Sequence, residues 1–263
     1  MNILNLGFGS LEAQLWVIVL LSIRSGAALM AAPMIGGTGV PVQLRILLSL
    51  VLGYFVASWV PLPAPPPMLS IAAVLAVVQE IAVGLMLGFV LQIAFAIPLI
   101  AAEQIAGTMG LAIATSVDPS SGAQSGALGT YLGLVMSLLF YATGAHLLWF
   151  ELMVESYRLL PAGQFAFGSW RAESVVLFMG YGLATAAAIA LPVVLVLLLV
   201  QIVTGLIARS APALNLNTLG LPAGVVAGIA AMIIALPVMT AQIRGAIEAA
   251  LEQTEVLLRP EAP

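Results

Sequence analysis

The chain has 263 residues, of which 62% are hydrophobic and only 7% are charged. Because soluble domains carry about 25% charged residues, this chain has too little polar surface to stay in water. A net charge of −4 weighs against a nucleic acid partner, there is no cysteine for a disulfide or thiolate site, and one histidine cannot make a zinc site alone. The sequence therefore predicts an integral membrane protein that holds no metal and no cofactor.

Six apolar segments are long enough to cross a membrane, because a span needs roughly 20 mainly apolar residues. They cover residues 11–30, 44–60, 69–97, 127–150, 175–207 and 219–243. The third and fifth exceed the length of a perpendicular span, so we expect them to tilt or to continue beyond the bilayer. The first basic residue, Arg24, lies inside the first apolar segment, so the start of the chain does not read as a cleavable signal peptide. The expected fold is a single all-α membrane domain over residues 1–263.

The helices and their ends carry further signals. Pro98, Pro192 and Pro237 interrupt helical runs, and each is expected to kink its helix. Residues 246–263 read as a short amphipathic tail, because apolar positions fall on one helical face and acidic positions fall elsewhere. The apolar positions are Ile243, Ile247, Leu251 and Leu258, and the acidic ones are Glu248, Glu252 and Glu255.

Glycines recur at every fourth position in several segments, a spacing that places them on one helix face and lets backbones approach closely. The sets are Gly84/Gly88, Gly122/Gly126, Gly129/Gly133 and Gly220/Gly224/Gly228. Two interpretations stay open at this point. The glycines serve packing within the chain, or they serve tight contact with other subunits.

Three charged residues lie in or beside apolar segments: Arg24, Glu80 and Glu103. A charge in the middle of a bilayer costs about 2.5–3.5 kcal/mol on insertion scales, so each needs a partner or a path to water. Glu80 is either part of a proton relay or half of a structural ion pair with Arg24 or Arg45. The ion pair is favoured, because a single carboxylate without titratable neighbours makes a poor relay.

Residues 103–126 form a glycine-rich and hydroxyl-rich segment between two apolar runs. Lipid cannot hydrogen-bond irregular backbone, so this segment must be covered by protein or line water. Ser120, Ser121 and Ser125 lie near Asp118, but no histidine or lysine in the segment could act as a base, and no oxyanion motif is visible. The sequence therefore does not indicate an enzyme.

Several spaced motifs resemble the FliR family of flagellar export-gate membrane proteins. They run from Arg24-x8-Pro33-x7-Pro41-x3-Arg45 and Gln79-Glu80-x3-Gly84-x3-Gly88-Phe89 through Ala106-Gly107-x-Met109-Gly110-x7-Asp118-Pro119-x2-Gly122-x-Gln124-Ser125 to Gly144-x-His146. The resemblance covers residues 11–245, and the Met-Gly…Asp-Pro…Gly segment is its specific part. Residues 211–222 also resemble the loop of the family's last hairpin.

The resemblance implies a FliP-like helical part over residues 11–160, a FliQ-like hairpin over residues 174–245 and the short tail after it. It also implies assembly with FliP-like, FliQ-like and FlhB-like membrane subunits at the flagellar basal body in the bacterial inner membrane. Unfolded polypeptide would pass through that assembly. In the family, the loop between the third and fourth segments plugs the pore, which here gives residues 107–124. The candidate plug residues are Gly107, Met109, Gly110, Asp118, Pro119, Gly122 and Gln124.

Two departures from the family pattern concern this same loop. Thr108 stands where the family commonly has glutamine, and Gly129-Thr130 stands where it often has a basic residue. The alternative to a plug is an ordinary interhelical link buried by its neighbours. Two alternative functions also stay open: the equivalent subunit of a virulence type III secretion system, and a small-solute secondary transporter, for which the chain shows no convincing repeat.

Overall fold

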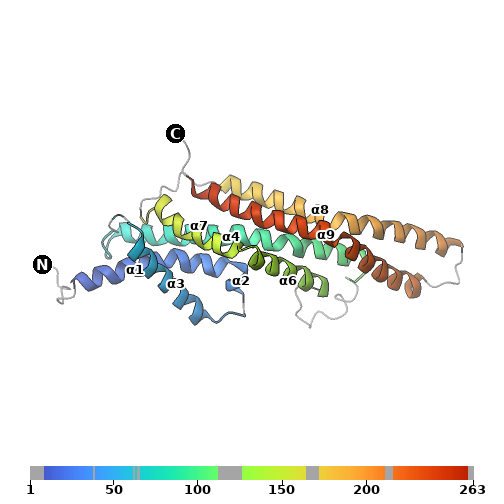
Figure 1. The fold of residues 1–263 in the computed structure, drawn as a ribbon, viewed down its shortest axis with the longest axis horizontal. Helices are drawn as coiled ribbons and strands as arrows, with labels where there is room; N and C mark the ends of the chain where they lie inside the picture. Colours follow the sequence, from blue (N-terminus) through green and yellow to red (C-terminus); the bar gives the residue numbers. More distant parts are fainter. Residues whose placement is uncertain are drawn as a thin grey trace. The chain divides into compact units, whose positions relative to one another are not determined.

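The computed structural model describes residues 9–37, 39–61, 63, 66–111, 126–163, 172–210 and 216–259, and regular structure within these ranges is helical (Figure 1). The helices are α1 (Gly9–Ala31), α2 (Pro33–Gly36), α3 (Val42–Trp59), α4 (Ile71–Thr108), α6 (Ala127–Ala142), α7 (Ala145–Leu159), α8 (Ala172–Ser210) and α9 (Leu216–Leu258). Five of them are long and apolar enough to cross a membrane, and α6 with α7 makes a sixth candidate. The expectation of an all-α protein with about six long apolar helices is confirmed for the described residues.

The chain divides into two compact units. The first takes the described parts of residues 1–92, 144–176 and 250–263, and the second takes those of residues 93–143 and 177–249. Helices α4, α8 and α9 therefore contribute to both units. The division into a part over residues 11–160 and a hairpin over 174–245 stays a prediction from the family resemblance.

The first unit is held together by small residues where α1 meets α3 and α4. A Cβ atom added at Gly53 of α3 would lie 2.9 Å from the Ile18 oxygen of α1, and one at Gly84 of α4 would clash with the Arg24 oxygen. At Gly88, one turn further along α4, an added Cβ would lie 2.6 Å from the Ala28 oxygen. Glycine is therefore needed at these positions for the backbones to approach. For Gly84 and Gly88, the structure supports packing within the chain.

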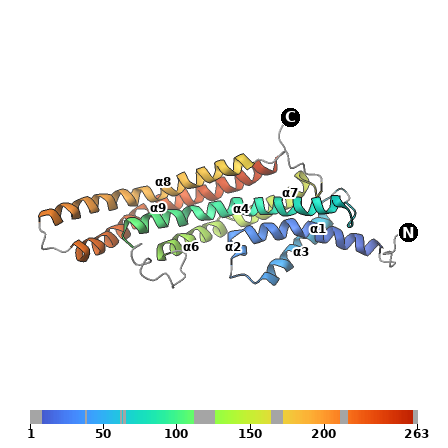
Figure 2. The same cartoon turned by 180° about the vertical axis from the view of Figure 1, so that it is seen from behind.

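The second unit contains the C-terminal half of α4, α6 and most of α8 and α9. Helices α8 and α9 run side by side in opposite directions in both views (Figures 1 and 2). Gly182 of α8 faces α4, where an added Cβ would lie 3.2 Å from the Ile93 side chain. Phe95 of α4 and Phe140 of α6 meet edge to face with their ring centroids 5.3 Å apart. Apolar contact of this kind accounts for the core of the unit.

The predicted span over residues 127–150 is wrong as one continuous helix. Helix α6 ends at Ala142 and α7 begins at Ala145. Between them Gly144 has φ +73°, a left-handed conformation that favours glycine and cannot continue an α-helix. Gly144 therefore ends the first helix and starts a second one.

The end of α4 differs because the helix continues through a proline expected to interrupt it. Helix α4 passes Pro98 and ends at Thr108, 11 residues beyond the predicted Ile97. Pro192 likewise lies inside α8, and Pro237 lies inside α9 together with Pro222. A proline removes one backbone bond, and tightly packed neighbours keep the rest of the helix in place.

The expected tail is the last part of α9, because this helix continues without a break to Leu258. The faces agree with the amphipathic pattern. Ile243, Ile247 and Leu258 are buried, and Leu251 is half-buried. The three acidic residues Glu248, Glu252 and Glu255 are exposed.

Candidate functional site

The end of α4 is the base of the predicted plug loop, and a specific backbone motif closes the helix there. Gly110 has φ +84° and its N–H donates to the Gly107 oxygen at 3.1 Å, while the Leu111 N–H donates to the Ala106 oxygen at 3.0 Å. This pair of bonds around a left-handed residue is the Schellman arrangement of a helix C-terminus. Gly110 is therefore the residue at which the chain leaves the helix.

The other described glycines of this region, Gly107 and Gly126, do not adopt a left-handed conformation. Gly107 lies inside α4, and Gly126 precedes α6 with φ −62°. An added Cβ would meet no atom within 4 Å at either position. Close approach therefore does not explain these two glycines.

Met109 anchors the end of α4 onto α9. Its side chain is buried, and it lies against two glycines that are one turn apart on α9. A Cβ at Gly228 would clash with the Met109 side chain, and a Cβ at Gly224 would lie 3.3 Å from the Met109 oxygen. Because Gly224 and Gly228 have no side chains, Met109 of the same chain can pack directly against the α9 backbone.

A hydrogen bond from α8 completes the capping of α4. The Gln201 side-chain amide donates to the Thr108 backbone oxygen at 2.8 Å. The last carbonyls of a helix have no partner inside the helix. The Schellman bonds occupy those of Ala106 and Gly107, so Gln201 supplies the donor for the next one. The Thr108 hydroxyl donates to the Gln104 oxygen at 2.7 Å, within α4 itself.

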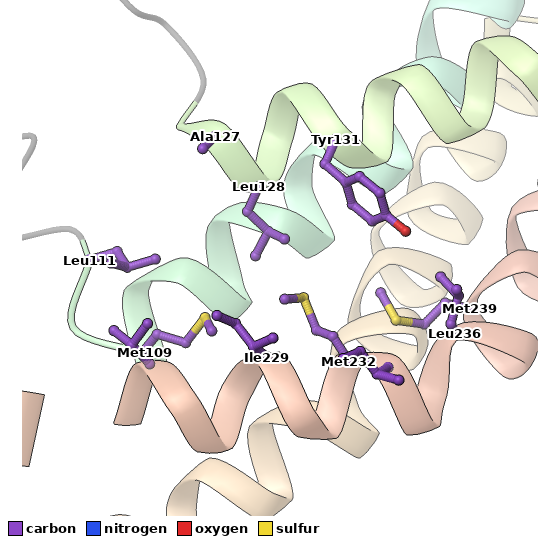
Figure 3. Close-up of a pocket in the computed structure, with 11 residues that line it drawn as sticks. Met109, Leu111, Ala127, Leu128, Tyr131, Ile229, Met232, Leu236 and Met239 are labelled. Atoms are coloured by element: carbon purple, nitrogen blue, oxygen red, sulfur yellow. The ribbon is translucent and has the colours of Figure 1, made fainter. Parts of the chain in front are cut away.

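An apolar groove of about 370 Å³ opens beside this anchored end (Figure 3). It is lined by Met109, Leu111, Ala127, Leu128, Tyr131, Val225, Ile229, Met232, Ile233, Leu236 and Met239. Two of the lining residues, Leu111 and Ala127, flank residues 112–125 in the sequence. Figure 3 shows the Met232 and Met239 sulfurs between α6 and α9, with the Tyr131 ring beside them.

The chemistry of the groove suits a deformable apolar contact rather than catalysis or polar recognition. Methionine side chains are unbranched and polarizable, and they adapt to surfaces of different shape at low cost. An apolar cavity of this kind gives a water molecule too few polar partners to be held. The groove can therefore exclude water while it changes shape.

A second site, in the first unit, joins α1, α4 and α7 through a buried guanidinium. Arg24 and Glu80 have fully buried side chains, and they form a two-pronged ion pair at 2.7 and 3.0 Å. Arg24 also donates to the Ser156 backbone oxygen at 2.7 Å, to the Ser156 hydroxyl at 3.1 Å and to the Leu160 oxygen at 2.7 Å. A guanidinium has five N–H donors, and all five are thus occupied.

The Arg24 cluster also contains an aromatic ring. The Arg24 guanidinium carbon lies 4.3 Å from the centre of the Tyr157 ring, and the Tyr157 hydroxyl donates to the Leu21 oxygen at 2.5 Å. Gln79 donates to the Pro161 oxygen at 3.3 Å, just past the end of α7. The cluster therefore ties the C-terminal end of α7 to α1 and α4, and its geometry is that of a structural junction.

The structure brings together only some of the residues singled out from the sequence. Glu80 lies against Arg24, one of its two expected partners, whereas Arg45 binds the backbone oxygens of Gly37 and Val40. Glu103 is exposed, and no residue in the described part of the chain forms an ion pair with it. Asp118, Pro119, Gly122 and Gln124 lie outside the described residues.

Sequence reasoning missed three contributors to these sites. Gln201 could have been found as the one amide side chain among the 39 residues of α8. Ser156 and Tyr157 could not, because nothing in the sequence shows that α7 turns them toward Arg24. Across the described residues, no group of three or more histidine, cysteine or acidic side chains could hold a metal ion.

These features define a multi-pass, all-helical membrane protein whose buried polar groups join its own helices. Residues 15–250 match the family of bacterial export proteins, family 1, and the chain belongs to this family, which includes the FliR proteins. It is 30% identical to the flagellar biosynthetic protein FliR of Escherichia coli over 82% of this chain and 83% of that protein. It is 30% identical to FliR of Bacillus subtilis over 91% and 93%.

A third relative comes from outside the flagellar proteins. The surface presentation of antigens protein SpaR of Salmonella typhimurium is 30% identical over 65% of this chain and 64% of that protein. The flagellar relatives thus match a larger share of the chain. Met109, Gly110 and the two α9 glycines that pack against Met109, Gly224 and Gly228, all fall inside the matched residues.

Proposed function

We propose that this chain is a subunit of the flagellar type III protein-export gate and helps to form the channel through which flagellar subunits pass. The observation that carries the proposal is the family match over residues 15–250, which includes nearly all of the described helices. The family consists of components of an export apparatus and is not a known enzyme family. We infer a channel component with no catalytic role.

The flagellar assignment is favoured over the virulence one by the extent of the matches. The Escherichia coli and Bacillus subtilis flagellar relatives cover 82% and 91% of the chain, whereas SpaR covers 65%. A small-solute transporter receives no support from the groove, which is lined by apolar side chains and lacks charged groups for binding a solute.

We further propose that residues 107–124 act as a plug that faces the channel. Its base is fixed by the helix-ending conformation of Gly110, by the packing of Met109 against two glycines of α9 and by the hydrogen bond from Gln201 to the Thr108 oxygen. Next to this base, the methionine-lined groove offers an apolar surface that can deform. A seal of this kind blocks ions while it yields to a passing polypeptide, because apolar contacts have no fixed geometry.

The partners we propose are FliP-like, FliQ-like and FlhB-like membrane subunits in the bacterial inner membrane. Much of the apolar surface of this chain needs cover from lipid or protein. Only 17% of the apolar window of α3 and 28% of those of α8 and α9 are buried within the chain. An assembly with other helical subunits would provide that cover.

Co-purification tests the assignment most directly. The full chain is produced with the neighbouring membrane proteins of its own gene cluster, and the tagged chain is purified in mild detergent. We expect a stable complex with two other small hydrophobic proteins. A chain that purifies alone, and that transports a small solute in liposomes, would overturn the proposal.

A deletion tests the plug. We expect removal of residues 110–116 to leave assembly largely intact and to make the complex leak ions, because the loop no longer reaches across the channel. Ion conductance of the purified complex in planar bilayers is the measurement. In a second variant, glycine and serine replace residues 112–116, so the loop keeps its length but loses its side chains. Comparing this variant with the deletion shows whether the length of the loop or its side chains block the ions. Unchanged conductance in the deletion would argue against the plug.

A further inference from the structure

A second groove lies in the first unit, between α3 and α7, and it combines an apolar floor with acidic groups. It has a volume of about 530 Å³ and is lined by Val51, Leu52, Phe55, Phe150, Glu151, Val154, Glu155 and Arg158. Val51 is 54% exposed and Phe55 is 42% exposed, so their apolar surface is not covered by the chain itself. The groove is thus open to a partner.

The charges in the groove do not cancel. Arg158 pairs with Glu155 at 3.1 Å, one turn away on α7. Glu151 is exposed and lies one turn further toward the N-terminus of the same helix. In the described part of the chain it takes part in no ion pair. One negative charge is left over on an otherwise apolar surface.

The described basic residues of this unit are engaged elsewhere. Arg24 has all five donors occupied, Arg45 binds two backbone oxygens, and Arg259 pairs with Glu255. A carboxylate that becomes buried against an apolar partner is unfavourable unless a cation pairs with it. No described basic residue of this unit is therefore free to pair with Glu151, and a basic group on a partner molecule would supply the missing positive charge.

We propose that the groove between α3 and α7 receives an apolar helix of another membrane subunit, and that an arginine or lysine on this helix pairs with Glu151. The exposed side chains of Val51 and Phe55 provide apolar contact on the α3 side of the groove. Such a pair sets which helix fits and in which register, because a helix without the basic residue leaves the carboxylate unpaired. The proposal rests on the proposed function only in that the chain assembles with other membrane subunits.

Charge reversal tests the pairing in the full chain produced with its gene-cluster partners. We expect Glu151→Lys to reduce the amount of complex recovered by at least about tenfold, because two like charges then meet in the interface. Glu252→Lys is the matched control and is expected to assemble normally, since it makes the same charge reversal at an exposed carboxylate of α9 that does not line the groove. Suppressors of Glu151→Lys that restore motility should change an arginine or lysine of a partner helix to an acidic residue.

Crosslinking identifies what fills the groove. The chain has no cysteine, so Val51→Cys places one unique thiol there for a bifunctional reagent. An adduct with a different membrane subunit supports the proposal. Adducts only with phospholipid, or with a second copy of this chain, overturn it, as does normal assembly of Glu151→Lys. If the unaltered chain forms no complex at all, the proposed function fails instead, so the two failures are distinguishable.

Discussion

Replacing Glu80 with glutamine should disrupt the fold of the first unit rather than proton transfer. Two of the five Arg24 bonds end on the Glu80 carboxylate. A glutamine amide has one oxygen and one NH2 group, so its oxygen can replace only one of the two carboxylate acceptors. At the other position its NH2 group would face an N–H group of Arg24, and two donors cannot bond to each other. The guanidinium also keeps its charge while it loses the only carboxylate that the described residues place against it.

The magnitude follows from the burial of the pair. Removing one partner of a buried ion pair costs about 3–5 kcal/mol, because the other charge is left uncompensated. Domains are typically stable by only about 5–15 kcal/mol, so this loss is a large fraction of the total. The junction with Ser156 and Leu160 weakens at the same time, since Arg24 also holds the end of α7.

The assay is thermal unfolding of the purified complex in detergent, combined with the yield of assembled complex from membranes. We expect the unfolding midpoint of Glu80→Gln to fall by more than about 5 °C. Glu103→Gln, on the exposed face of the same helix, is the control and should unfold like the unaltered chain. The double variant Arg24→Gln with Glu80→Gln should lose less than the sum of the two single changes, because no charge is then left alone. An assembled complex of normal stability that exports nothing would refute this reasoning and make Glu80 part of the proton path.

Two further predictions concern packing and the loop base. Gly84→Val should prevent assembly, because the valine side chain would collide with the Arg24 backbone oxygen. Gly180→Val should be tolerated, because an added Cβ at Gly180 meets no atom within 4 Å. The yield of folded complex is measured for both variants. Gln201→Met should lower stability by only about 1 kcal/mol, the net worth of one hydrogen bond, yet raise the ion conductance of the complex because the end of α4 is held less firmly. Equal conductance in Gln201→Met and the unaltered complex would show that this bond does not set the seal.

The parts of the fold that could be predicted from the sequence are those governed by local hydrophobicity. Long apolar runs must become helices in a membrane, so the six segments could be predicted, with errors at their ends and at one internal break. The break at Gly144 was missed, because one glycine in an apolar run is equally compatible with a helix interior. The extent of α4 was missed for the opposite reason, since a proline in a membrane helix often leaves the helix intact.

The sites were harder to predict because they depend on residues far apart in the chain. Glu80 and Arg24 stand out as charges, but the choice between Arg24 and Arg45 as partner needs the packing of α1 on α4. The role of Ser156 requires knowing how α7 is rotated, and no periodic signal reports this when much of a helix surface is apolar. Gly110 could not be singled out by chemistry alone, because a left-handed helix end favours glycine and the neighbouring Gly107 and Gly126 do not adopt that conformation.

The bonds of Arg24 have a consequence for the biogenesis of the protein. Its acid partner lies 56 residues later in the chain and its serine partner lies 132 residues later. At synthesis rates of about 5–20 residues per second, Arg24 leaves the ribosome about 3–11 s before Glu80 and about 7–26 s before Ser156. During that interval α1 carries an unneutralised cation, which costs about 2.5–3.5 kcal/mol at the centre of a bilayer. Insertion of the first helix by itself is therefore less favourable by this amount until α4 brings Glu80 to Arg24.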